Sequence, residues 1–219
     1  MPFWEAEGPH RDETATEQTS HDDIPLPPAD GGPLHWQVAG VTTGLRLRSS
    51  PSTQAATLMT YPAGSVLSNL GCRRANGRLW CDFQHFRGGA RGFVAAEFLT
   101  PAISPNGAAI MGPDTSALRA GKGEFDATGK LPCSEDPARP TGECPFGLAR
   151  TGGGYATVVV TRPNGLTRAI FFQMGVPTSA DTSEADGYPE FTAEKRDDVH
   201  FISVGSERYE IVDAVVLGW

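Results

Sequence analysis

The four cysteines are the residues whose spacing most restricts the chemistry available to this chain. Cys72 and Cys81 enclose an Asn-Gly dipeptide in GCRRANGRLWC, and Asn-Gly between two strand-like arms is the strongest short-range signal for a β-hairpin. The two thiols would then face each other across the hairpin and could close a disulfide. Cys133 and Cys144 bracket the polar segment SEDPARPTGE. That segment has no apolar face to hold it, and a second local disulfide would restrain it.

Disulfide formation competes with other uses of these thiols. Four cysteines allow three pairings, of which the local pairing is the most economical. Buried or zinc-binding free thiols are the alternative, but neither pair has the two-residue spacing of a zinc knuckle. We therefore expect two disulfides, no metal and no cofactor. Two disulfides imply an oxidising compartment, so the chain is predicted to be periplasmic or secreted.

The histidines raise the question of nucleophilic catalysis. They are His10, His21, His35, His85 and His200. His200 could be written as a triad with Ser203 and Asp213, but the segment has no nucleophile elbow. A Cys-His peptidase centre is disfavoured because every cysteine has a disulfide mate. We expect no catalytic residue, and we interpret His200 as a half-exposed histidine on a strand.

Two loops have compositions that can hold ions in other proteins. TGGGYATVVV, residues 151–160, lacks the Lys-Ser/Thr ending of a phosphate loop and leads into a strand, so it is predicted to be a turn. DTSEADGYPE, residues 181–190, places carboxylates ahead of Gly187. Because their spacing departs from that of an EF-hand, we interpret the segment as an ordinary acidic loop.

The secondary structure predicted around these residues consists mostly of β-strands. The chain contains 26 Gly and 18 Pro, which predicts many turns rather than long helices. Two further hairpins are expected around Pro-Asn-Gly at 163–165 and around Gly205-Ser206, since β-branched and aromatic residues flank both turns. Residues 122–219 are therefore predicted to form an antiparallel sheet of roughly four to six strands. Residues 102–121, rich in Gly, Pro, Ala and Ser, are predicted to be a linker.

Net charge divides the chain into three regions. Residues 1–33 carry −7, which predicts a disordered acidic tail, residues 34–101 carry +5, and residues 102–219 carry −6. The basic region could attract an anionic partner in competition with the tail, or its arginines could simply solubilise a small β domain. With an isoelectric point near 5.1, no nucleic acid is expected as a partner. No membrane span and no signal peptide are visible.

The basic region also contains an ordered set of residues that resembles the bacterial SH3-like (SH3b) family. In GLRLRSSPST the matching residues are Leu45, Leu47, Arg48, Ser49, Pro51 and Ser52. In YPAGSVL, RLW and RGFVAAEFL they are Gly64, Val66, Leu67, Trp80, Phe93 and Leu99. Arg46 and Ser50 stand where the family has Asn and Gly, and Phe93 stands for its Trp. The C-terminal half resembles the β-rich halves of exported bacterial SH3b proteins of unassigned function.

The predicted fold is all-β, with a small SH3-like barrel over residues 34–101 and a second small antiparallel β domain. Alternation of apolar residues predicts the barrel core. The predicted core residues are Val66, Leu67, Leu70, Trp80, Phe83, Phe93 and Val94. So small a barrel buries little apolar area, which gives the disulfide between Cys72 and Cys81 a stabilising role.

The resemblance implies a binding function, because the family mostly binds cell-wall peptide or a partner protein. We place the binding groove between the loop after Arg48 and the hairpin tip at 87–91. The predicted ligand-binding residues are Arg48, Tyr61, Trp80, Phe86, Arg87 and Arg91. For Trp80 a core role is equally consistent with the pattern, whereas Phe86 beside RGGAR is expected to lie near the surface.

The predicted function is that of a non-catalytic exported protein that docks on peptidoglycan or on a protein of the bacterial cell envelope. The alternative is an inhibitor or immunity-type protein. Its C-terminal domain would block a wall-degrading enzyme with a loop such as 134–143 or 181–190. The sequence makes no prediction of the oligomeric state.

Overall fold

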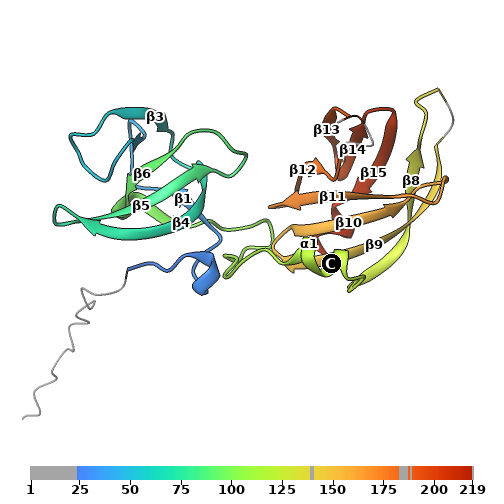
Figure 1. Cartoon of the computed structure of the whole chain (residues 1–219), viewed down its shortest axis with the longest axis horizontal. Coiled ribbons are helices and arrows are strands. Elements are labelled where there is room, and N and C mark those ends of the chain that lie inside the picture. Colours follow the sequence, from blue (N-terminus) through green and yellow to red (C-terminus); the bar gives the residue numbers. More distant parts are fainter. Residues whose placement is uncertain (1–23, 139–140, 183–186, 188, 219) are drawn as a thin grey trace, which may run out of the picture.

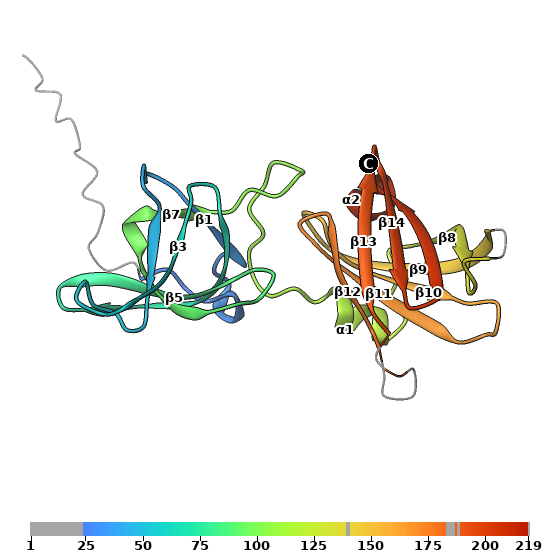
Figure 2. The ribbon, with the colours of Figure 1, turned by 90° about the horizontal axis from the view of Figure 1, so that it is seen from above.

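The structure, a computed structural model, describes residues 24–218 except 139–140, 183–186 and 188. It contains two all-β domains, each built on one antiparallel sheet, which lie side by side along the long axis of the molecule (Figure 1). The view from above shows the same two sheets joined by a linker (Figure 2). The predicted all-β fold class with two antiparallel sheets is confirmed.

The first domain is a seven-stranded sheet with the order β3-β2-β6-β5-β4-β1-β7. Its strands are β1 His35–Val38, β2 Leu45–Arg48, β3 Thr57–Tyr61, β4 Val66–Ala75, β5 Arg78–His85, β6 Arg91–Ala95 and β7 Leu99–Pro101, with a 3-10 turn η2 at Ala96–Phe98. The first and last strands pair, with Gln37 opposite Thr100. The chain therefore enters and leaves this domain at neighbouring strands.

The hairpin β4–β5 carries the first cysteine pair. Asn76 and Gly77 connect the strands with φ of 51° and 73°, the left-handed values that a tight two-residue turn needs. Cys72 lies directly opposite Cys81, with a Cα–Cα distance of 3.9 Å, and the two sulfur atoms form a disulfide. The local pairing predicted for these cysteines is confirmed.

The first core contains most of the apolar residues expected there. Leu67, Trp80, Phe83 and Val94 are buried, whereas Leu70 is 40% exposed. The prediction for Leu70 is wrong because a bulge between Asn69 and Cys72 shifts the register of β4. A bulge adds one residue to one strand and interrupts the regular alternation of faces.

The buried side chain of Asn69 fixes the segment that precedes the first strand. Its Nδ2 donates to the carbonyl oxygens of Leu26 at 2.9 Å and Pro33 at 2.8 Å. Between these two residues the chain forms a 3-10 turn, η1, at Pro28–Asp30. The predicted acidic tail at 1–33 therefore needs a correction, since its last part, residues 26–33, is packed against the first domain. The remainder of that prediction, residues 1–23, lies outside the described residues.

The predicted linker is shorter than expected at its C-terminal end. Helix α1, Ser116–Gly121, packs on the second sheet, where the Ser116 and Thr157 hydroxyls lie 3.0 Å apart. Arg119 of this helix donates to the carbonyl oxygen of Arg150 and pairs with Asp126. The helix therefore belongs to the second domain, and residues 102–115 form the connection.

The second domain is an eight-stranded sheet with the order β12-β11-β10-β9-β8-β15-β14-β13. The strands are β8 Ala127–Ser134, β9 Gly142–Gly152, β10 Tyr155–Thr161, β11 Thr167–Gln173, β12 Val176–Ala180, β13 Phe191–Arg196, β14 Val199–Val204 and β15 Glu207–Val212, followed by helix α2 at Asp213–Leu217. The expectation of roughly four to six strands was too low. Both predicted hairpins are present, β10–β11 and β14–β15.

The strand order of the second domain is that of an up-and-down barrel with one open seam. Every strand pairs with its neighbours in sequence, and β8 pairs with β15, so that the first and last strands are partners. The exception is the consecutive pair β12 and β13, which are the two edges of the sheet. In the part of the chain that the structure describes, no ladder joins these two edges.

The second core is filled by side chains from both halves of this sheet. The largest fully buried side chains include Leu148, Ile170, Phe172, Ile202 and Tyr209. Cys133 and Cys144, which lie on β8 and β9, form the second disulfide with a Cα–Cα distance of 5.8 Å. Both predicted disulfides therefore join neighbouring strands of one sheet.

An ionic cluster is buried beside this core. Glu207, on β15, accepts hydrogen bonds from Arg168 Nε at 2.9 Å and from the Tyr209 hydroxyl at 2.6 Å. Arg162 also pairs with this carboxylate. Burial works to raise the pKa of Glu207, but the hydrogen bonds from Arg168 and Tyr209 outweigh it, and the net effect is a lowered pKa.

The two domains meet at the turn between β9 and β10. This turn contains Gly152, Gly153 and Gly154, all with positive φ, so the predicted turn at TGGGY is present. A Cβ atom on Gly154 would lie 2.2 Å from the backbone nitrogen of Gly175, which only glycine can avoid. Next to this turn, the Tyr155 ring of β10 stacks on the His35 ring of the first domain.

Candidate functional site

The first domain has a surface hollow whose walls carry three arginines, and we refer to it as the arginine hollow. Its volume is about 330 Å³. It is lined by residues 40–46, which connect β1 to β2, and by Arg48, Thr53, Arg78, Trp80, Ala95 and Phe98. Loop, strand and 3-10 turn thus meet on one side of the barrel.

The arginine hollow combines aromatic rings with positive charge. The Arg78 guanidinium lies 5.5 Å from the centroid of Trp80 and 5.8 Å from that of Phe98, which places it against two aromatic faces. Arg78 also pairs with Glu97, while Arg48 donates to the carbonyl oxygen of Ala55. Arg46 is exposed at the rim. Three cations therefore face one carboxylate.

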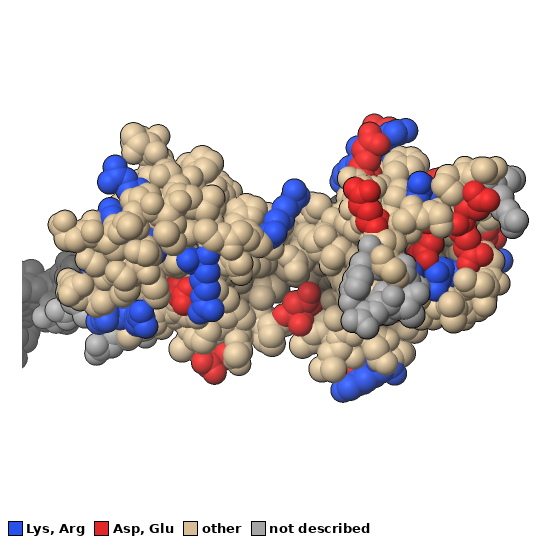
Figure 3. Space-filling view, turned by 45° about the horizontal axis from the view of Figure 1, so that its top comes forward, with Lys and Arg blue, Asp and Glu red and all other residues tan. Residues whose placement is uncertain are grey.

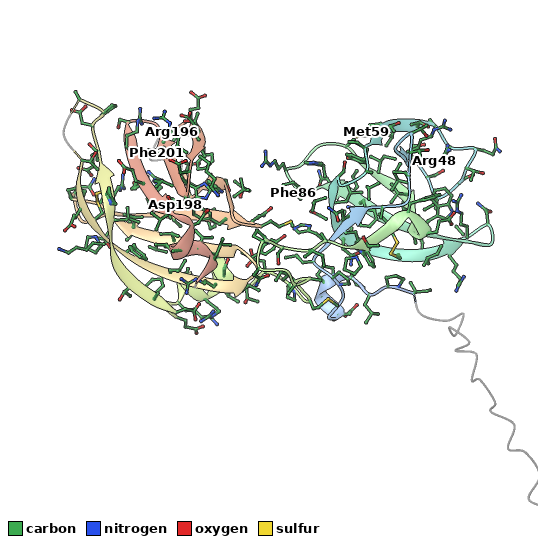
Figure 4. All side chains as sticks on the ribbon, turned by 180° about the vertical axis from the view of Figure 1, so that it is seen from behind. Arg48, Met59, Phe86, Arg196, Asp198 and Phe201 are labelled. Carbon is green, nitrogen blue, oxygen red and sulfur yellow. A yellow bond between two sulfur atoms is a disulfide. The ribbon has the colours of Figure 1, made fainter. Side chains whose placement is uncertain are left out.

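The six predicted ligand-binding residues do not form a single groove. Arg48 and Trp80 line the arginine hollow, although Trp80 is only 2% exposed. Phe86 and Arg87 lie elsewhere, on the side of the first domain that faces the second domain, whereas Arg48 lies on the far side (Figure 4). The groove predicted from the sequence is thus divided between two places.

The remaining two predicted residues belong to neither place. Tyr61 is 4% exposed and forms part of the core, where burial raises its pKa and its ring stacks with His85. Arg91 is exposed and makes a two-pronged pair with Asp82, at 2.7 Å and 2.9 Å. That pair leaves the Arg91 guanidinium partly occupied.

Comparison with known proteins supports the resemblance. The sequence model of the family described as bacterial SH3 domain matches residues 43–100. Residues 43–100 are a bacterial SH3 domain. The first sheet is slightly longer than this match, because strand β1 precedes it and completes the SH3 domain by pairing with β4 and β7. Domains of this kind are typically binding modules and not catalysts.

No curated protein and no solved structure matches this chain significantly.

None of the described helices is long and apolar enough to cross a membrane. Within the residues that the structure describes, no group of His, Cys, Asp and Glu side chains is arranged to hold a metal ion. Glu184 and Asp186 of the 181–190 loop lie outside the described residues.

A second cleft lies at the open seam of the second domain, and we refer to it as the seam cleft. Its volume is about 510 Å³. The SH3 domain contributes Phe86 and Arg87, β12 contributes residues 176–179, and β13 contributes residues 193–195. Gln173 and His200 complete the lining. Residues of both domains therefore share this cleft.

A small polar network occupies one wall of the seam cleft. The Nε2 atom of His200 lies 2.9 Å from Oδ1 of Asp213, and Lys195 Nζ lies 2.6 Å from Oδ2 of the same carboxylate. Burial lowers the pKa of His200, and Asp213 opposes this shift only in part. The imidazole is accordingly neutral at pH 7, with the ammonium of Lys195 as the charged group beside it.

The structure separates Ser203 from this network. His200 is 2% exposed on the inner face of β14, and Ser203, three positions along the same strand, points to the opposite face. His200 and Asp213 therefore have no serine nucleophile in Ser203. His200 is also more buried than the half-exposed strand histidine that the sequence predicted.

Only part of the seam cleft is indicated by the sequence. The sequence suggests a pairing of His200 with Asp213, but nothing in it points to Lys195. Its position opposite His200 follows from the β13–β14 hairpin, which a tight turn at Asp197, φ 54°, connects. The approach of Phe86 and Arg87 depends on how the two domains pack, and no local pattern encodes that.

Proposed function

We propose that this chain is a non-catalytic binding protein of the bacterial cell envelope, periplasmic or secreted, whose SH3 domain docks on peptidoglycan or on a partner protein there. The observation that carries the proposal is the arginine hollow of a bacterial SH3 domain. Its Arg78 guanidinium lies against the rings of Trp80 and Phe98, and Arg46 and Arg48 line the same hollow, an arrangement suited to a peptide that carries carboxylates. Two disulfides are consistent with an oxidising compartment.

The charge distribution supports an anionic ligand for this domain. Residues 34–101 carry a net charge of +5 within a chain whose net charge is −8. On the face shown in Figure 3, most of the SH3 domain surface is uncharged and its charged side chains are basic more often than acidic, whereas the second domain displays both signs. Such an asymmetry steers an anionic surface toward one end of the molecule.

The proposal is tested by sedimentation with purified peptidoglycan. Arg46 and Arg48 both line the arginine hollow, and we expect the double variant Arg46→Gln/Arg48→Gln to lower the retained fraction roughly three- to tenfold. Arg91→Gln is the matched control, because it removes one arginine of the same domain outside the hollow. Docking on peptidoglycan through this hollow is contradicted if the double variant is retained as strongly as the wild type. It is also contradicted if the wild type itself is not retained.

The inhibitor or immunity-type function is a second candidate, which one observation favours. The β8–β9 loop protrudes at the end of the second domain that is distant from the SH3 domain (Figure 1). The disulfide Cys133–Cys144 joins the two strands at the base of this connection, and a cross-link there reduces the conformational entropy that is lost when a loop enters an active site. Lysozyme clearing of a cell-wall suspension is the test. Slower clearing with the wild type, and not with Cys133→Ala/Cys144→Ala, supports inhibition.

A further inference from the structure

The basic residues of the SH3 domain gather on the outer face of its sheet. Strands β2, β6, β5 and β4 are neighbours in that order, and the register places Arg48 opposite Phe93 and Arg73 opposite Trp80. Residues opposite each other share a face of the sheet, and the residues between them, such as Val94, point the other way into the core. Alternation therefore places five arginines on this outer face, which we call the basic face: Arg46, Arg48, Arg73, Arg78 and Arg91.

Only two arginines of the basic face have a carboxylate partner among the described residues. Arg78 pairs with Glu97, and Arg91 pairs with Asp82. The other three arginines make no ion pair within the part of the chain that the structure describes. Arg48 lies on the side of the SH3 domain that is away from the second domain (Figure 4). The basic face therefore carries uncompensated positive charge that can attract carboxylates.

The first described residues of the chain lie at the border of the basic face. Pro27 lines a hollow of about 230 Å³ together with Arg73 and Phe93, and the Arg73 guanidinium lies 4.7 Å from the centroid of the Phe93 ring. Pro25 lines another hollow together with Glu97, whose carboxylate pairs with an arginine of the basic face. The segment that precedes residue 24 therefore starts beside this face.

That segment, residues 1–23, lies outside the described residues and is strongly acidic. Its side chains contain seven carboxylates and one arginine, a net charge of −6. The chain from residue 24 back to Asp12 can span up to about 40 Å, whereas a domain of about 70 residues has a radius of gyration of about 11 Å. Because a tethered segment has an effective concentration in the millimolar range, even a weak attraction would keep it bound.

We propose that residues 1–23 bind across the basic face, where their carboxylates meet the unpaired guanidinium groups of Arg46, Arg48 and Arg73. Arg46 and Arg48 also line the arginine hollow, so a segment bound to them competes with an anionic ligand of that hollow. Only this competition rests on the proposed function of the chain. The binding of residues 1–23 to the basic face is independent of it.

The experiment uses the full chain and a carbodiimide, which joins a lysine amine to a carboxylate that lies in contact with it. The SH3 domain, residues 34–101, contains no lysine, so Arg46→Lys introduces a single amine there and keeps the charge. Thr100→Lys is the control for simple proximity. Thr100 is exposed and follows Leu99, which lines the same hollow as Pro25, but β7 lies outside the basic face.

The cross-linked monomer is digested and analysed by mass spectrometry. We expect Arg46→Lys to give cross-links to residues 1–23 in about threefold or greater excess over Thr100→Lys. This excess is expected even though strands β6 and β5 separate Arg46 from β4, beside which Pro27 lies. At about 1 M salt, where the Debye length is about 3 Å, the excess should disappear.

Two variants that each remove three negative charges test the competition. One changes residues 1–23, and the other changes exposed acids of the second domain. They are Asp12→Asn/Glu13→Gln/Glu17→Gln and Glu143→Gln/Glu190→Gln/Glu194→Gln. We expect the first variant to raise the fraction retained by purified peptidoglycan about threefold, since an anionic competitor is weakened. The second variant is expected to change retention much less, because it alters net charge alone.

Each part of the proposal has outcomes that overturn it. Equal cross-link yields from Arg46→Lys and Thr100→Lys, an excess that persists in high salt, or cross-links found only between two copies of the chain overturn the binding of residues 1–23 to their own basic face. Equal retention of the two triple variants overturns the competition. If Arg46→Lys cross-links as expected but peptidoglycan retains no form of the protein, the binding stands, and the competition fails together with the proposed function.

Discussion

The imidazole of His35 stacks on the ring of Tyr155, with centroids 5.5 Å apart and an angle of 28° between the ring planes. His35 begins the first strand of the SH3 domain, and Tyr155 begins β10 of the second domain. Both residues are buried, and burial lowers the pKa of His35 to about 4. The contact between the two domains therefore depends on a neutral histidine.

Acid is expected to weaken this contact through His35. Because the pKa is about 4 in the folded protein and about 6.5 in an unfolded chain, the folded form loses stability as the pH falls below 6.5, and the loss is complete below pH 4. The full effect is roughly 3 kcal/mol. Thermal unfolding of the wild type and of His35→Phe between pH 7 and pH 4 measures it. Parallel curves for the two proteins would show that His35 is not responsible.

The disulfide of the β4–β5 hairpin is expected to stabilise the SH3 domain. Removing it in Cys72→Ala/Cys81→Ala should lower the free energy of unfolding by about 2 to 4 kcal/mol, because the unfolded chain regains freedom. Denaturant titration followed by the tryptophan fluorescence of the SH3 domain gives the value. The variant Cys133→Ala/Cys144→Ala removes the other disulfide. It should leave the denaturant midpoint for unfolding of the SH3 domain unchanged. Equal losses in both variants would show that the domains unfold as one unit.

The buried carboxylate of Glu207 is expected to be among the most sensitive positions in the second domain. Glu207→Ala leaves Arg162 and Arg168 buried without their shared anion, and loss of one partner of a buried ion pair costs about 3 to 5 kcal/mol. Glu143→Ala is the control, since Glu143 and its partner Lys130 are both more than 60% exposed. If the denaturation midpoint of Glu207→Ala is as close to that of the wild type as the midpoint of Glu143→Ala is, Glu207 does not stabilise the second domain in this way.

Asn69 is expected to hold residues 26–33 against the SH3 domain. Replacement by alanine removes both hydrogen bonds from its amide group, to Leu26 and Pro33, and should cost roughly 1 to 3 kcal/mol. Proteolysis with a broad-specificity enzyme, followed by mass spectrometry, should show faster cleavage between residues 24 and 34 in Asn69→Ala. Cleavage elsewhere at the same increased rate would indicate general destabilisation instead.

The hairpins were predictable from the sequence because their signals are local. Asn76-Gly77 and Pro-Asn-Gly at 163–165 specify turns by the backbone angles that their residues tolerate, and the disulfide Cys72–Cys81 follows from the first of them. Strands β8 and β9 were missed because Pro132, Pro145 and several glycines interrupt any alternating pattern. Their pairing is held by the disulfide Cys133–Cys144 and by long-range contacts of the sheet.

The candidate site was only half predictable for a related reason. Arg48 and Trp80 could be placed together because both match the residue pattern of the bacterial SH3 family. Phe86 and Arg87 were assigned to the same groove because they are near in sequence to its expected rim, yet the β5–β6 turn directs them toward the second domain. Contacts between domains, unlike strands and turns, leave no regular pattern of residues in the sequence.

In both domains the first and last strands are hydrogen-bonded partners, β1 with β7 and β8 with β15. The chain therefore enters and leaves each sheet at two neighbouring strands. A domain with this arrangement can be inserted into a surface loop of another protein without disrupting the strand pairing of its own sheet. Residues 24–33, which lead into the SH3 domain, lie beside the linker that follows this domain, because Pro33 and Met111 form an isolated antiparallel β-bridge. Each domain thus has its two attachment points on neighbouring strands, so either one can be exchanged for another domain while its sheet stays intact.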